Sequence, residues 1–126
     1  MIQRQSLLTV VDNSGAKIVQ CISILGGFNK KVAFIGDIII VSVKQLRVKN
    51  KSKVKIKKGE VLRAIIVKTK YRKKKKDGTS LSFNCNSGVL LNKQNKPVAT
   101  RILSSIPKEF RHHKFMKIAS LSSAIL

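Results

Sequence analysis

The residue types that catalyse reactions or bind metals are few in this chain and lie far apart in the sequence. Its five acids are Asp12, Asp37, Glu60, Asp77 and Glu109, and none shares a short motif with another. Metal-dependent nucleases and polymerases need carboxylates that converge on two ions about 4 Å apart, and this spacing predicts no such convergence. Asp12, Asp37 and Asp77 lie in glycine-containing turn segments, so we interpret them as turn residues.

Two histidines and two cysteines are the remaining candidates for metal ligands. His112 and His113 are adjacent, and neighbours on a helix point about 100° apart, which suits joint ligation poorly. Neither Cys21 nor Cys85 belongs to a CxxC pair. We interpret the cysteines as small core residues and the histidines as facing solvent or phosphate; a zinc site built from all four is the alternative. The sequence predicts no metal and no cofactor.

Nucleotide-binding and hydrolase motifs are missing from the sequence. There is no Gly-Lys-Ser/Thr segment of a P-loop and no Gly-x-Ser-x-Gly elbow. We therefore expect that the chain is not an enzyme.

Basic residues dominate the composition, with 27 Lys and Arg against 5 acids and a formal net charge of +22. So few acids cannot neutralise these cations within the chain, and the self-repulsion favours binding to a polyanion. An exposed, merely solvated face is the alternative for each lysine-rich run. The side chains that we expect to bind RNA phosphates lie mostly in segments 47–58 and 68–76: Lys44, Arg47, Lys49, Lys51, Lys53, Lys55, Lys57, Lys58, Lys68, Lys70, Arg72, Lys73, Lys74, Lys75 and Lys76.

The polyanion is predicted to be nucleic acid and not a membrane surface. No stretch approaches the roughly 18 to 20 apolar residues of a spanning helix, and the basic residues follow strand-like alternation instead of one amphipathic helix. The aromatic residues are five Phe and one Tyr, without a paired RNA-stacking motif. We therefore expect recognition of folded RNA by shape and backbone in preference to base stacking.

The first half of the chain has the pattern of β-strands separated by turns. In segment 17–25, Ile18, Ile22 and Ile24 are predicted to share one face with Gln20. In segment 38–45, a β-branched run, Ile39, Val41 and Val43 are predicted to share one face. Segment 47–58 is predicted to form a basic β-ribbon in which lysines alternate with apolar residues.

The second half adds two more strands and then changes pattern. Segment 60–70 is predicted to hold Val61, Ile65 and Val67 on one face, and Asp77-Gly78 predicts a hairpin after the second basic run. A short apolar strand is expected at 88–91. Pro107 can occupy the first turn of a helix.

Beyond Pro107, apolar residues recur at helical spacing, and they are Phe115, Ile118, Ala119, Leu121 and Ile125. Many short strands followed by a small helical tail predict a mostly β fold of the barrel kind. We expect one domain, 1–126, with the barrel at about 1–102 and the helical tail at about 103–126.

These segments resemble, in order, the family of large-subunit ribosomal protein fourteen of the bacterial and organellar type. The similar segments run from Met1-Ile2-Gln3 to the end of the chain. They include Asp12-Asn13-Ser14-Gly15-Ala16, Leu25-Gly26-Gly27, Gly36-Asp37-Ile38-Ile39, Lys57-Lys58-Gly59-Glu60-Val61-Leu62, Asp77-Gly78, Val89-Leu90-Leu91-Asn92, Thr100-Arg101-Ile102 and Lys114-Phe115-Met116-Lys117-Ile118. Two segments depart from the family pattern: 47–58 is longer and richer in lysine, and Ser122-Ser123-Ala124 stands where Ala-Pro-Glu is usual.

The resemblance implies a small five-stranded β-barrel with a protruding basic β-ribbon and a short helical C-terminal region. It also implies a structural component of the large ribosomal subunit that binds large-subunit rRNA near the small subunit. The implied partners are that rRNA, neighbouring large-subunit proteins, small-subunit rRNA and anti-association factors, with no membrane. Positions matching the exposed interface of the family are Thr100, Arg101, Lys114 and Lys117.

Two other classes of function remain as alternatives. A free single-strand-binding barrel would carry aromatics alternating on one face, and an enzyme would bring acids or a nucleophile and a base together. Abundant Lys, Ile and Asn, all with codons rich in A and T, indicate an AT-rich genome such as that of an organelle. The excess of lysine and the divergent C-terminus favour an organelle-encoded protein of the mitochondrial ribosome. A plastid or a bacterial cytoplasm is the alternative location.

Overall fold

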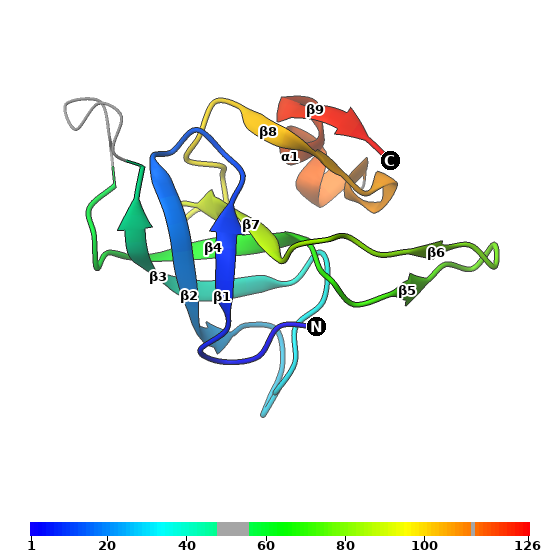
Figure 1. Ribbon diagram of the computed structural model, residues 1–126, viewed down its shortest axis with the longest axis horizontal. Coiled ribbons are helices and arrows are strands. Elements are labelled where there is room, and N and C mark those ends of the chain that lie inside the picture. The colour runs from blue at the N-terminus through cyan, green and yellow to red at the C-terminus, as the bar shows by residue number, and fades with distance from the viewer. Residues whose placement is uncertain (48–55, 112) are drawn as a thin grey trace.

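A closed barrel of five strands forms the body of the protein (Figure 1). The computed structural model describes residues 1–47, 56–111 and 113–126. The barrel strands, in order around it, are β1 (Leu7–Val10), β2 (Ala16–Ile24), β3 (Ile38–Leu46), β4 (Val61–Lys68) and β7 (Ser87–Leu91). Neighbouring strands are antiparallel except β1 and β7, which close the barrel in parallel. The predicted five-stranded, mostly β fold is confirmed.

A two-stranded ribbon extends from the barrel between β4 and β7 (Figure 1). It consists of β5 (Lys73–Lys74) and β6 (Ser80–Leu81), which pair antiparallel. The turn is closed by the Lys75 N–H, which donates to the Thr79 carbonyl at 2.7 Å, and Gly78 has a φ of 83°. The hairpin predicted from Asp77-Gly78 is thus confirmed. Most of the other predicted ribbon, 48–55 of segment 47–58, lies outside the described residues.

The C-terminal region packs on one side of the barrel (Figure 1). It contains β8 (Ile102–Ile106), the 3-10 helices η2 (Lys108–Arg111) and η3 (His113–Phe115), α1 (Met116–Leu121) and β9 (Ser122–Ile125). The short helices follow Pro107, as predicted. The helical stripe was predicted too long, because Ile125 lies in strand β9 and not on a helix. The parallel pairing of β8 with β9 was not predicted, because it joins segments that are short and separated by the helices.

Two apolar clusters share the strands β4 and β7. Ala64, Ile66 and Leu90 belong to the cluster inside the barrel, and Ile65 and Val89 belong to the cluster beneath the C-terminal region. Both faces of these strands are therefore buried, which explains their nearly continuous apolar sequences. Inside the barrel, the shared face predicted for Ile39, Val41 and Val43 is confirmed, since all three are fully buried.

The face predicted for β4 is buried along only part of the strand. Ile65 and Val67 are buried beneath the C-terminal region, but Val61 is 58% exposed. Val61 has the expected orientation along the strand but lies outside both apolar clusters. Alternation predicts the direction of a side chain, whereas its burial depends on what covers that part of the strand.

The face predicted for β2 is wrong. The buried residues in this strand include Val19, Cys21 and Ile24, whereas Ile22 is exposed and Ile18 only half-buried. Pairing with β3 is irregular just before Val19 and just after Cys21. Such irregularities shift the alternation by one residue, so a single period could not describe the whole strand. The expected burial of Cys21 is confirmed, but Cys85 is only half-buried and belongs to neither apolar cluster, so its interpretation as a core residue is wrong.

Candidate nucleic-acid interface

The described cations that we expect to bind RNA fall into two groups on opposite sides of the barrel (Figure 1). One group follows the end of β4 and the β5–β6 ribbon and comprises Lys68, Lys70, Arg72, Lys73, Lys74, Lys75 and Lys76. The other lies at the end of β3 and in the connection to β4 and comprises Lys44, Arg47, Lys57 and Lys58. Lys49, Lys51, Lys53 and Lys55 lie outside the described residues.

Some cations of the ribbon group already have partners within the chain. Lys73 Nζ forms an ion pair with Glu109 of η2 at 2.7 Å. Arg72 Nε donates to Ser80 Oγ at 2.8 Å across the ribbon, and Lys68 Nζ lies 5.3 Å from the centre of the Phe83 ring. These contacts fix the ribbon and its base. No local pattern in the sequence predicts the Lys73–Glu109 pair, which joins residues 36 positions apart.

The other ribbon lysines, Lys74, Lys75 and Lys76, are not part of the two ion pairs that the described residues form. Lys74 and Lys76 are exposed and Lys75 is half-buried. Three ammonium groups on a protruding ribbon can approach several phosphates in an RNA groove that is too narrow for the barrel itself. Their charge is the kind that binds an RNA backbone.

The group at the end of β3 contains one structural cation. Arg47 is half-buried and its Nη2 donates to the Val10 carbonyl at 2.9 Å, so this guanidinium helps to hold β3 against β1. Lys44, Lys57 and Lys58 are exposed. The backbone N–H of Lys57 donates to Glu60 Oε2 at 3.0 Å, which closes the turn before β4.

The acids act within turns, as predicted. Asp37 accepts a hydrogen bond from the Phe34 N–H at 2.8 Å and pairs with Lys30 Nζ at 2.8 Å. Asp77 accepts hydrogen bonds from the hydroxyl and the N–H of Thr79, and these bonds hold the pKa of its carboxyl below the ordinary value.

Asp12 is fully buried in the turn after β1. It accepts hydrogen bonds from the N–H and hydroxyl of Ser14 and, at 2.9 Å, from the N–H of Leu90 in β7. The turn role of Asp12 thus extends to a neighbouring strand.

No metal site is formed within the described part of the chain, where no three His, Cys, Asp or Glu side chains gather. His112 lies outside that part, and so does the side chain of His113. No helix among the described residues is long and apolar enough to span a membrane.

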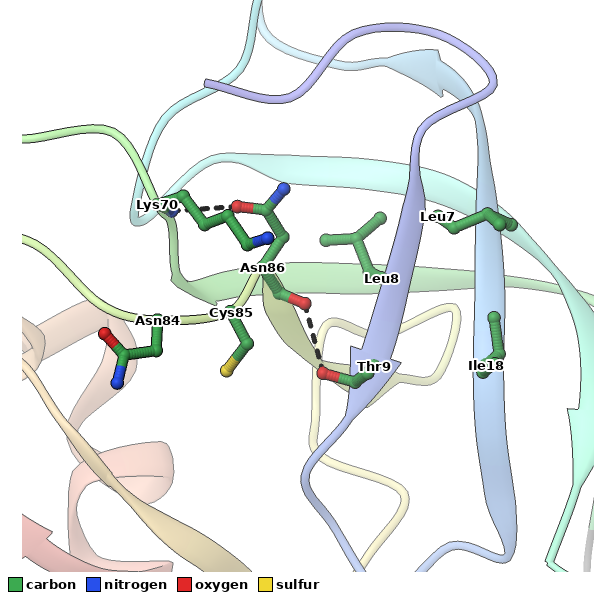
Figure 2. Close-up of a pocket in the computed structure, with 8 residues that line it drawn as sticks. All are labelled: Leu7, Leu8, Thr9, Ile18, Lys70, Asn84, Cys85 and Asn86. Carbon is green, nitrogen blue, oxygen red and sulfur yellow. Dashed lines mark hydrogen bonds between the residues drawn. The ribbon is translucent and has the colours of Figure 1, made fainter.

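A pocket of about 250 Å³ lies beside β1, near the base of the ribbon (Figure 2). Two hydrogen bonds to Asn86 hold its edge in place. The backbone carbonyl of Asn86 accepts one from Thr9 Oγ1 at 3.1 Å, and its side-chain Oδ1 accepts the other from the Lys70 N–H at 2.9 Å. None of its eight lining residues is an acid or a histidine, so the pocket itself supplies no carboxylate or imidazole base. The lining residues are Leu7, Leu8, Thr9, Ile18, Lys70, Asn84, Cys85 and Asn86.

The residues that the resemblance implies for a subunit interface are all exposed: Thr100 and Arg101 before β8, Lys114 in η3 and Lys117 in α1. Asn13 positions the first two. Its Nδ2 donates to Thr100 Oγ1 at 2.9 Å, and its Oδ1 accepts from the N–H groups of Thr100 and Arg101 at 3.1 and 3.2 Å. The sequence marked Asn13 only as part of a turn, because its partners lie 87 and 88 residues away.

Comparison with known families agrees with this architecture. The model of the family described as ribosomal protein L14p/L23e matches residues 1–126, which is the whole sequence given. The resemblance stated from the motifs is therefore confirmed. This chain belongs to the ribosomal protein L14p/L23e family.

Proposed function

We propose that this chain, as a structural constituent of the large ribosomal subunit, binds rRNA phosphates mainly through the exposed lysines of its two basic groups. The family implies the ribosomal role and the association with rRNA and other ribosomal proteins. The observation that carries the assignment to particular residues is the ribbon, where Lys74, Lys75 and Lys76 protrude from the barrel outside the ion pairs of the described residues. Binding there would release counterions from the RNA and so depend strongly on salt.

The test compares two triple variants of equal net charge. Replacing Lys74, Lys75 and Lys76 with Ser should weaken binding to protein-free large-subunit rRNA and reduce the slope of log affinity against log salt by about 2 to 2.7, at 0.7 to 0.9 per phosphate contact. The matched control replaces Lys93, Lys96 and Lys108, which are also exposed, and should change the slope less. Equal losses in the two variants would show that only net charge matters.

We propose that Thr100, Arg101, Lys114 and Lys117 form one exposed face that meets the small subunit. The planar fork of Arg101 and the point charge of Lys117 suit an RNA backbone or the acidic surface of an anti-association factor. Lys117 precedes the buried Ile118 on α1 and is itself exposed, so its side chain is available to a partner.

Charge reversal tests this face. The double variant Arg101→Glu/Lys117→Glu should enter large subunits normally but reduce their joining to small subunits, measured on sucrose gradients. If the variant fails to enter large subunits, the two residues belong to the rRNA anchor and the assignment of the face is wrong.

The proposed location is the mitochondrial ribosome, because the chain has an excess of lysine and its C-terminal Ser122-Ser123-Ala124 departs from the family pattern. Fractionation of cells followed by gradient sedimentation should find the chain in stoichiometric amounts with mitochondrial large subunits. Sedimentation with plastid or bacterial subunits would correct the location, and absence from every large subunit would contradict a structural, non-catalytic role.

A further inference from the structure

Among the residues that the structure describes, Phe28 is the one aromatic side chain without a contact to another ring or to a cation. The chain has five Phe and one Tyr. Phe34 contacts Tyr71 and Phe110 contacts Phe115, each pair with ring centres 5.8 Å apart, while Phe83 lies under Lys68. Phe28 has a relative exposure of 104%. Its ring is therefore fully available to another molecule.

The segment that carries Phe28 extends away from the barrel between β2 and β3 (Figure 1). Positive φ angles at Gly26 (100°) and Asn29 (54°) turn the backbone on either side of Phe28. Glycine and asparagine are the residues that tolerate this conformation best. The local sequence thus places a large apolar ring at the turn of a protruding loop.

Contacts at the base of the loop hold it in place. Ile2 and Ala33 exchange two backbone hydrogen bonds of 2.8 Å, which attach the returning side of the loop to the N-terminal segment. Asp37 pairs with Lys30 Nζ at 2.8 Å and accepts from the Phe34 N–H at 2.8 Å. At the base of the loop, the Leu25 N–H donates to the Ile38 carbonyl at 3.1 Å and so joins its two sides. The loop that presents the ring is therefore held in place, which lowers the entropy cost of binding through it.

We propose that Phe28 stacks on an unpaired base of the large-subunit rRNA. The charge of the loop favours RNA over an apolar pocket in a protein. Residues 25–37 contain one acid, Asp37, which pairs with Lys30, and the charge of Lys31 is left over. Lys31 is exposed and can meet the phosphates beside a stacked base. Every base presents a π-face to an aromatic ring, so stacking requires no particular sequence. The inference rests on the proposed rRNA binding and adds a base contact to it.

Substitutions that separate stacking from apolar burial test the proposal on protein-free large-subunit rRNA. Phe28→Ala should weaken binding by roughly 5- to 150-fold, the range for loss of one base-stacking aromatic. Phe28→Leu should resemble Phe28→Ala more than wild type, because leucine keeps apolar area but lacks a π-face. Phe28→Trp should bind at least as tightly as wild type. None of these changes should alter the salt slope, since no charge is removed.

The Phe28→Trp variant also supplies a direct signal, because the chain contains no other Trp. Stacking on a base should quench the indole emission when the rRNA is added. Leu103→Trp is the matched control on an exposed side chain of β8, 59% exposed, and should be quenched less.

The outcomes distinguish failure of this inference from failure of the proposed function. Wild-type affinity in both Phe28→Ala and Phe28→Leu, with the salt slope intact, would overturn the stacking contact alone. So would an indole emission that shifts only when large-subunit proteins are added, which would indicate an apolar protein pocket. Wild-type binding without salt dependence would instead contradict the phosphate-binding function itself.

Discussion

Asp12 connects the turn after β1 to strand β7 through a buried carboxylate. Asp12→Ala would remove the acceptor for the Ser14 N–H and the Leu90 N–H and leave buried donors unpaired. We expect the free energy of unfolding to fall by about 2 to 3 kcal/mol, measured by urea denaturation. Asp77→Ala is the control, because Asp77 makes similar hydrogen bonds in an exposed turn; its denaturation midpoint should stay close to wild type. If both variants lose the same free energy of unfolding, burial does not strengthen the contribution of the Asp12 hydrogen bonds to stability.

The two cysteines should differ in reactivity. Burial raises the pKa of the Cys21 thiol, against a smaller lowering by Arg4, and the thiolate is the reactive form. Near pH 8, a thiol reagent should therefore label the half-buried Cys85 quickly and Cys21 slowly. Cys85→Ser should leave only the slow phase, and a fast phase in that variant would contradict the burial of Cys21.

The raised pKa of Cys21 also predicts a dependence of stability on pH. The unfolded thiol ionises at lower pH than the folded one, so the folded state loses stability as the pH rises above the ordinary thiol value of 9.0. Below that pH the thiol is protonated in both the folded and the unfolded state, so it does not make stability depend on pH. Cys21→Val should reduce the loss of stability at alkaline pH, measured by denaturation at pH 8 and pH 10.

At the scale of elements, β4 and β7 approach so closely that one position excludes a side chain. A Cβ at Gly88 would lie 3.0 Å from the Ile65 carbonyl oxygen, a backbone atom that moves only if the sheet moves. Gly88→Ala should therefore lower the free energy of unfolding by about 1 to 3 kcal/mol, measured in urea. Gly27→Ala is the control, since its Cβ would meet Lys30 at an ordinary 3.7 Å; unchanged stability in both variants would contradict the close approach.

The β5–β6 ribbon, in contrast, is expected to be dispensable for folding. Replacing Lys73, Lys74, Lys75 and Lys76 with Ser removes one exposed ion pair, Lys73–Glu109, worth at most about 1 kcal/mol. Relief of repulsion between cations acts in the opposite direction. The thermal transition, followed by circular dichroism, should stay similar or rise, and Glu109→Gln measures the ion pair separately. Loss of the β signal would show that the ribbon is needed for the barrel. A similar expectation for segment 51–57 lies mostly outside the described residues.

At the scale of the whole molecule, a net charge of +22 opposes compaction. The Debye length falls from about 30 Å at 0.01 M salt to about 10 Å at 0.1 M, so added salt should raise Tm. The Lys74→Ser/Lys75→Ser/Lys76→Ser variant, with a net charge of +19 (22 − 3), should show a shallower rise. A Tm independent of salt would mean that self-repulsion does not limit the stability of the free protein.

The sequence by itself determined the features that depend on neighbouring residues. Alternation along β3 predicted its buried face, Asp77-Gly78 predicted the turn of the ribbon, and collinear motifs predicted the family and the barrel. The predominance of lysine over acids likewise predicted a polyanionic partner. These signals are local or compositional, so each can be read without knowing what lies beside it in space.

Only the tertiary structure decided the features that depend on distant residues. Irregular pairing with β3 changes which side chains of β2 are buried. Val61 of β4 is exposed because the C-terminal region does not cover that end of the strand. Asn13 positions Thr100 across 87 residues, and Glu109 pairs with Lys73 across 36. Among the described residues, Phe28 could be identified as an exposed ring only because the structure shows each other aromatic ring in contact with a second ring or with Lys68. Burial, pairing and exposure are properties of the contacts between segments, and one strand's alternation does not specify which segment will lie against it.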